Sequence, residues 1–134
     1  MTIKLAGYAK DDQKVKDGVQ VNLGTNEDGT KRWILVKPLN SAAYEDRLEA
    51  LKKPHGRAVE RDKALLREIQ RRAFCEVCFV NLGGWKGEDG TVIENTLENR
   101  IAMCEDRDFY ADAITAAGER YTFEANAKEA DAGN

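Results

Sequence analysis

The spacing of the apolar side chains changes near Pro38, and this change sets the fold class. Before it, residues 19–23 alternate apolar and polar side chains with the period of two that is typical of a half-buried β-strand. Residues 33–36 form a second β-branched and aromatic run, and residues 3–8 offer a further extended segment. We therefore expect residues 1–39 to form a small antiparallel β-meander.

Short turn sequences separate these runs. Asp17-Gly18 follows residues 14–16, which we expect to be extended, and Asp-Gly between extended runs is a strong signal for a tight turn. The tetrapeptide Glu-Asp-Gly-Thr occurs twice, at residues 27–30 and 88–91. Both copies lack the alternating oxygen ligands and the distal glutamate of a calcium-binding loop, so both are predicted to be turns.

After Pro38 the apolar residues recur every three or four positions, which is typical of amphipathic helices. So few strands cannot bury both faces of a sheet, and we expect four helices to cover one of them. The predicted fold is α+β and mostly α-helical, a single domain at residues 1–125 with helices in 40–125. Residues 126–134 contain no large apolar side chain and are expected to form a disordered tail. We expect the first helix to be capped by Asn40 or Ser41 and to end at Pro54 and Gly56. The second is expected to run from Arg57 to Leu82 and to end at Gly83-Gly84. The last two are expected to be capped at Asn95 and at Asp106 or Asp108.

The second predicted helix, residues 57–82, changes character midway. Its first half carries basic and acidic residues at helical spacing, which predicts a solvated face with salt bridges. Its second half, residues 73–82, has only Glu76 and Asn81 as polar residues and is predicted to lie at the centre of the core. The composition of residues 74–80 would also permit a strand, but no glycine or proline precedes it, so the helix is favoured.

The charge is unevenly divided along the chain. Residues 1–80 carry 16 Lys and Arg against 12 Asp and Glu, a net charge of +4, whereas residues 81–134 carry 5 against 12, a net charge of −7. Such polarity suits docking on other proteins, or head-to-tail association of copies of this chain. Nucleic-acid binding is not expected, because the sequence pI is about 5.3 and no stacking aromatic accompanies the basic run.

Little in the sequence predicts catalysis or metal binding. The chain has one histidine and three cysteines, and no apolar run approaches the length of a membrane span, so we expect a soluble protein of a reducing compartment that is neither an enzyme nor a cofactor binder. The Cys75 and Cys78 pair lies inside a predicted helix rather than at a helix N-terminus, so redox activity is not favoured. A zinc site could add Cys104 and His55, but small buried cysteines are the simpler interpretation.

Trp85 lies in a glycine-rich loop after the predicted core helix. A tryptophan in this position either covers the core as a lid or anchors a partner protein. Phe109 and Tyr110, in the last predicted helix, are candidates for the same two roles.

The order of several short motifs resembles the tail assembly chaperones of long-tailed (siphovirus-type) bacteriophages. The resemblance covers about residues 31–124, and Leu97 replaces a proline that is common in the family. Its motifs are Trp33-Ile34-Leu35-Val36 before Asn40-Ser41-Ala42-Ala43-Tyr44, Ala73-Phe74 before Leu82-Gly83-Gly84-Trp85-Lys86-Gly87, Asp89-Gly90 before Ile93-Glu94, Glu98-Asn99-Arg100, and Arg107-Asp108-Phe109 before Ile114 and Ala116-Ala117.

The resemblance implies a non-enzymatic assembly factor. Such a chaperone binds the tape-measure protein, keeps it soluble and recruits tail-tube subunits in the host cytoplasm, and it is not expected in the mature virion. Two alternatives stay open. One is a structural virion component, such as a tail terminator, connector or minor tail protein, and the other is a small zinc- or thiol-dependent protein that uses its cysteines.

Overall fold

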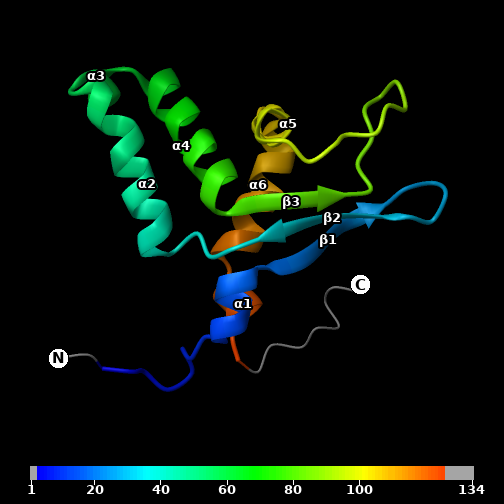
Figure 1. Ribbon diagram of the computed structural model, residues 1–134, viewed down its shortest axis with the longest axis horizontal. Coiled ribbons are helices and arrows are strands. Elements are labelled where there is room, and N and C mark those ends of the chain that lie inside the picture. Colours follow the sequence, from blue (N-terminus) through cyan, green and yellow to red (C-terminus); the bar gives the residue numbers. More distant parts are fainter. Residues whose placement is uncertain (1–2, 126–134) are drawn as a thin grey trace.

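The computed structural model describes residues 3–125, which form an α+β domain of one antiparallel sheet and several helices (Figure 1). The predicted fold class is confirmed, with more and shorter helices than expected. In chain order the elements are α1 (Asp12–Asp17), β1 (Val19–Thr25), β2 (Lys31–Val36), α2 (Ala42–Lys52), η1 (Lys53–His55), α3 (Ala58–Arg61), α4 (Lys63–Val77), β3 (Phe79–Gly83), α5 (Leu97–Met103), α6 (Arg107–Gly118) and η2 (Arg120–Phe123), where η denotes a 3₁₀ helix.

The sheet has the order β1-β2-β3, with β2 in the centre. Ile34 of β2 pairs with Val21 of β1 on one side and with Leu82 of β3 on the other. The two strands predicted at residues 19–23 and 33–36 are therefore confirmed. The third strand comes from the segment after α4, so the sheet is not wholly N-terminal.

The continuous helix predicted for residues 57–82 is wrong, because the chain leaves the helical path twice. Asp62 is extended and its side chain accepts a hydrogen bond from the Leu65 amide, which ends α3 and caps α4. At Cys78 the carbonyl accepts a hydrogen bond from the Lys37 amide at 2.8 Å, and the chain continues as β3. Pairing with β2 outweighs the local preference for helix. No glycine or proline marks the point at which the helix ends and the strand begins.

The N-terminal segment also differs from the prediction. Residues 14–16 lie in α1, which is capped by the Asp11 side chain, and Gly18 ends this helix with φ of +87° instead of forming a hairpin turn. Residues 3–8 form no strand. The chain pairs instead near residue 10, where the Asp11 amide donates to the Phe123 carbonyl at 2.9 Å. The predicted disordered tail lies outside the described residues.

Helix caps were predicted with mixed success. Ser41 caps α2 and Asp106 caps α6, each by accepting hydrogen bonds from backbone amides of the first turn. The cap of α5 is Thr96 rather than Asn95, whose side chain donates to the Val80 carbonyl of β3. Asn95 thus ties the loop before α5 to the sheet.

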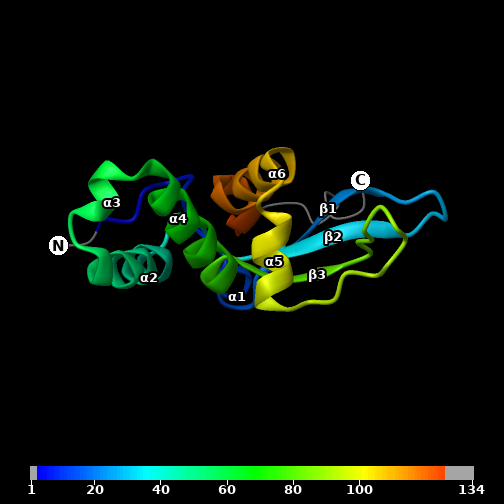
Figure 2. The same ribbon diagram turned by 90° about the horizontal axis from the view of Figure 1, so that it is seen from above.

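The core lies between one face of the sheet and helices α4, α5 and α6 (Figures 1 and 2). Ile34 and Val36 of β2 are completely buried on this face, and the Phe79 ring lies 5.7 Å from that of Phe109 on α6. The core cluster consists of Ile34, Val36, Phe74, Cys75, Cys78, Phe79, Leu82, Cys104, Ala113, Ala116, Ala117 and Phe123.

Candidate interaction surfaces

Trp85 lies directly after β3 and packs against the core cluster. Its indole Nε1 donates a hydrogen bond of 2.8 Å to the Trp33 carbonyl, and its ring meets Phe109 edge to face with centroids 5.0 Å apart. The Arg32 guanidinium lies 5.6 Å from the ring centroid on a further side. The ring is therefore held on three sides, and this geometry suits a lid over the core more than a free anchor.

Phe109 and Tyr110 are neighbours on α6 but contact different parts of the core. Phe109 contacts Trp85 and Phe79, whereas Tyr110 meets Phe74 edge to face at 5.6 Å. Burial raises the pKa of the Tyr110 hydroxyl above its usual range. The structure thus links the three predicted residues through a row of aromatic rings and does not place them in one exposed patch.

The face of the sheet opposite the core carries Trp33 and Leu35, and we call it the open face. Alternate residues of a strand point to opposite faces, so Trp33 and Leu35 lie away from Ile34 and Val36. Both are half-buried and lie outside the core cluster, while α5 and α6 cover the other side (Figure 2). The sequence did contain a signal for this face, because a run of four apolar residues leaves apolar side chains on both sides of a strand.

The Trp33 ring lies on the backbone of β3. A Cβ atom added to Gly83, its cross-strand partner, would come within 2.4 Å of the ring. The next residue, Gly84, has φ of +79°, and its Cβ would lie 2.1 Å from the Lys31 carbonyl oxygen. The Gly83-Gly84 pair therefore does not end a helix as predicted, but lets an aromatic ring and a neighbouring strand approach β3.

Apolar side chains are also exposed in the segment before α1. Ile3 and Leu5 keep 72% and 62% of their surface exposed, and Tyr8 keeps 55%. The Arg120 guanidinium lies 4.2 Å from the Tyr8 ring centroid and anchors the inner end of this segment.

The two Glu-Asp-Gly-Thr copies form matching turns at one end of the molecule, as predicted. Asp28 Oδ1 accepts from the Thr30 amide at 2.9 Å, and Asp89 Oδ1 accepts from the Thr91 amide at 2.9 Å. The pKa values of both carboxyl groups are lowered, mainly by the side-chain hydrogen bond from Thr30 at Asp28 and by the backbone hydrogen bond from Thr91 at Asp89. The two loops are joined by an Asn26 hydrogen bond of 2.7 Å to the Gly84 carbonyl.

All three cysteines are buried, which confirms that part of the prediction. Cys75 Sγ lies 3.6 Å from Cys104 Sγ, whereas Cys78 Sγ lies 3.6 Å from the Pro38 carbonyl oxygen. Burial raises the pKa of the Cys78 thiol to about 12, which disfavours the thiolate needed for redox or metal chemistry. Within residues 3–125 no three His, Cys, Asp or Glu side chains are arranged to hold a metal ion.

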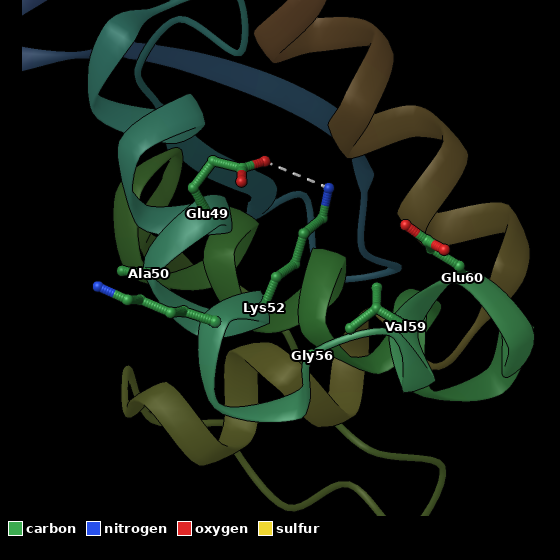
Figure 3. Close-up of a pocket in the computed structure, with 7 residues that line it drawn as sticks. Glu49, Ala50, Lys52, Gly56, Val59 and Glu60 are labelled. Atoms are coloured by element: carbon green, nitrogen blue, oxygen red, sulfur yellow. Dashed lines mark hydrogen bonds and ion pairs between the residues drawn. The ribbon is translucent and has the colours of Figure 1, made fainter.

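A pocket of about 620 Å³ lies where α2, η1 and α3 meet (Figure 3). Glu49 and Lys52 line it and form an ion pair at 3.5 Å, and the buried Val59 lies on its other side. The lining contains two acidic and two basic residues, so the pocket has no charge preference.

The charged half of the long predicted helix is solvated as predicted, but no ion pair joins side chains within residues 57–72, so the predicted salt bridges are wrong. In the described part of the chain, the only ion pair within α4 joins Arg72 to Glu76 at 3.8 Å. Glu76 also receives two hydrogen bonds from Arg47 of α2, at 2.6 and 3.1 Å. Glu76 therefore joins α2 to α4, and within residues 3–125 no ion pair is formed by the basic residues Arg57, Arg61, Lys63, Arg67 and Arg71.

Comparison of this chain with family models, curated proteins and solved structures finds no match. Among residues 3–125, no helix has both the length and the apolar character needed to cross a membrane.

Proposed function

We propose that this protein is a phage tail assembly chaperone, which binds and solubilises the tape-measure protein and recruits tail-tube subunits during tail assembly. The observation that carries the proposal is the apolar surface left outside the core, above all Trp33 and Leu35 on the open face. A protein that keeps an aggregation-prone partner soluble needs apolar surface of its own for that partner to cover. The motif order around Trp85 supports the same function.

The open face suits a partner helix with an apolar stripe. An aromatic ring buries about 150–250 Å² when covered, and tryptophan is enriched among the residues that dominate binding energy. Because the Trp33 ring lies flat over Gly83, its exposed side is presented without ordering a flexible side chain. The exposed residues Ile3 and Leu5 offer further apolar contacts in a segment that could adapt to a long partner.

Co-expression with the tape-measure protein tests the proposal. The wild-type chain should move the tape-measure protein into the soluble fraction and copurify with it in several copies. Trp33→Ala should abolish most of this effect, Trp33→Tyr should retain it, and Val92→Ala, at a loop residue that is 64% exposed, should leave it unchanged. Equal loss with Trp33→Ala and Val92→Ala, or a tape-measure protein that is soluble alone, would contradict the proposal.

The location of the protein separates a chaperone from a structural virion component. We expect it in the host cytoplasm during assembly and not in purified particles. Quantitative mass spectrometry of purified virions measures this directly, and a stoichiometric copy number would favour the structural alternative.

A further inference from the structure

Strand β1 forms one edge of the sheet, and nothing in its sequence protects that edge. Its seven residues, Val19–Thr25, include no charged residue and no proline, in a chain in which 34% of the residues are charged. Natural edge strands usually carry lysine, proline or a bulge, or are covered, because a free edge accepts another extended chain. The pairing of β1 with β2 is regular from Val19 to Asn22 and shifts only beyond Asn22. We call this regular part, about 13 Å long, the β1 edge.

The ladder shows which backbone groups of the β1 edge point outward. The Lys37 amide donates to the carbonyl that precedes β3, so Lys37 directs its backbone groups away from β1. Because these groups alternate along a strand, those of Val36 point towards β1, where Val36 pairs with Val19. Gln20 and Asn22 therefore direct their N–H and C=O groups outward. In the part of the chain that the structure describes, no hydrogen bond reaches these outward groups.

The opposite edge of the sheet, strand β3, is partly occupied by side chains. The Asn95 side chain donates to the Val80 carbonyl at 3.3 Å. The Asn81 side chain accepts a hydrogen bond of 2.8 Å from the Leu82 amide. These bonds use backbone groups of β3 that an added strand would need, whereas the outward groups of β1 are available.

We propose that the β1 edge binds an extended segment of a partner protein, which adds to the sheet as a fourth strand. Strand addition gains affinity from backbone hydrogen bonds and specificity from alternate side chains. On the core side the added strand lies beside Val19 and Val21, which are half-buried and pack against the core cluster. On the open face it lies beside the amide side chains of Gln20 and Asn22. The segment that fits is therefore uncharged and alternates apolar with small polar residues.

A segment of another protein suits the β1 edge better than a second copy of this chain. A stable dimer buries about 1,200–2,000 Å² in total, and so short a paired strand supplies only a small part of that area. Helix α1 lies next to the start of β1, where it limits the approach of a second folded copy (Figure 1). An extended segment needs little room, because paired strands lie only about 4.8 Å apart.

Binding of a synthetic peptide to the full chain tests the β1 edge. The inference does not depend on the proposed function, which concerns the open face. The probe is a peptide of about eight residues of alternating valine and threonine, N-methylated along one edge so that it does not form fibrils. Saturation with this probe should slow hydrogen exchange of the Gln20 and Asn22 amides by about tenfold or more. The same peptide N-methylated at every residue is the control and should have no effect.

Substitution of Gln20 separates the backbone from the side chain. Gln20→Pro removes an outward N–H and should weaken probe binding by about tenfold or more, whereas Gln20→Ala keeps the N–H and should bind the probe as wild type does. The Gln20 N–H takes no part in the ladder with β2, so Gln20→Pro should fold, and circular dichroism checks this. If this variant does not fold, hydrogen exchange of the wild-type amides decides the question alone.

Several results would overturn the proposal. Wild-type protein that does not bind the probe at millimolar concentration would do so, as would slower exchange confined to the amides of β3. Equal weakening by Gln20→Pro and Gln20→Ala would show that the side chain, rather than the strand edge, makes the contact. Exchange at Gln20 and Asn22 that slows with protein concentration in the absence of the probe would assign the β1 edge to a second copy instead.

Discussion

The sheet with α5 and α6 differs sharply from the hairpin end, by which we mean α2, α3 and residues 63–70 of α4. The residues of the core cluster lie in or next to the sheet, α5, α6 and η2 and in the second half of α4, and Phe74, Phe79 and Ile34 are completely buried. In the hairpin end only Val59 and Ile69 are buried. Figure 1 shows the hairpin end projecting from the sheet, and α4 is the helix that belongs to both regions.

The difference shows how one helix serves two purposes. In its second half α4 is surrounded by the sheet, α5 and α6, and it supplies three adjacent buried residues, 73–75. In its first half it packs against α2 and α3 and leaves the side chains of Lys63 and Arg67 in solvent. Regions with few buried apolar contacts open at a lower free energy than the core. We therefore expect the two regions to respond unequally to substitutions.

The largest effect is expected at Phe74, where α4 enters the core. Its completely buried ring contacts those of Phe79 and Tyr110, so Phe74→Ala removes contacts on two sides. The free energy of unfolding should fall by about 4 kcal/mol, as for other large-to-small changes in a packed core. Urea denaturation followed by circular dichroism measures this. A loss below about 1 kcal/mol would mean that this region is less tightly packed than the structure indicates.

Trp85 tests the edge of the same region. If the ring acts as a lid, Trp85→Ala should lower the free energy of unfolding by about 3 kcal/mol, because it loses the contact with Phe109 and the hydrogen bond to the Trp33 carbonyl. Val92→Ala, in the same loop and exposed, is the control and should be nearly neutral. A near-neutral Trp85→Ala that loses binding to the tape-measure protein would instead identify Trp85 as a partner anchor.

The sequence predicted the parts of the fold that local pattern determines. Alternation marked β1, a β-branched and aromatic run marked β2, the Ser41 cap marked α2, and Glu-Asp-Gly-Thr marked the two matching turns. Strand β3 was missed because its pairing with β2 is a long-range interaction, and the apolar residues before it continue a helical pattern. Helix α1 was missed because its six residues bury no side chain completely, so no apolar stripe announces it.

The candidate surfaces were predicted less well than the fold. Trp85, Phe109 and Tyr110 were chosen by residue type and position, but all three contact the core. The open face was not recognised, because a wholly apolar strand does not show which of its faces a helix will cover.

Ile69 tests the hairpin end. It is one of the two buried residues there. Ile69→Ala should lower the free energy of unfolding by about 2 kcal/mol, the lower part of the range for such changes, because the few surrounding side chains can partly close the cavity. Hydrogen exchange should become faster in α2 and the first half of α4, while the amides of β2 change little. Uniformly faster exchange in the sheet would mean that the hairpin end and the core unfold as one unit.

The smallest effect is expected at Glu76, which joins the two regions through Arg47 of α2. The hydrogen bonds from Arg47 lower the pKa of the Glu76 carboxyl, so the ionised form is favoured in the folded protein. Glu76→Gln should therefore cost about 0.5–1 kcal/mol near neutral pH. This stabilisation is present above the pKa of about 4.3 that a glutamate has in the unfolded chain, and it is lost as the pH falls through the lowered pKa of Glu76 in the folded protein. The free energies of unfolding of wild type and variant should therefore converge in acid. Glu49→Gln, which removes an exposed pair with Lys52, is the control and should show no such convergence. A difference between wild type and Glu76→Gln that persists in acid would show that Glu76 acts through packing rather than through its charge.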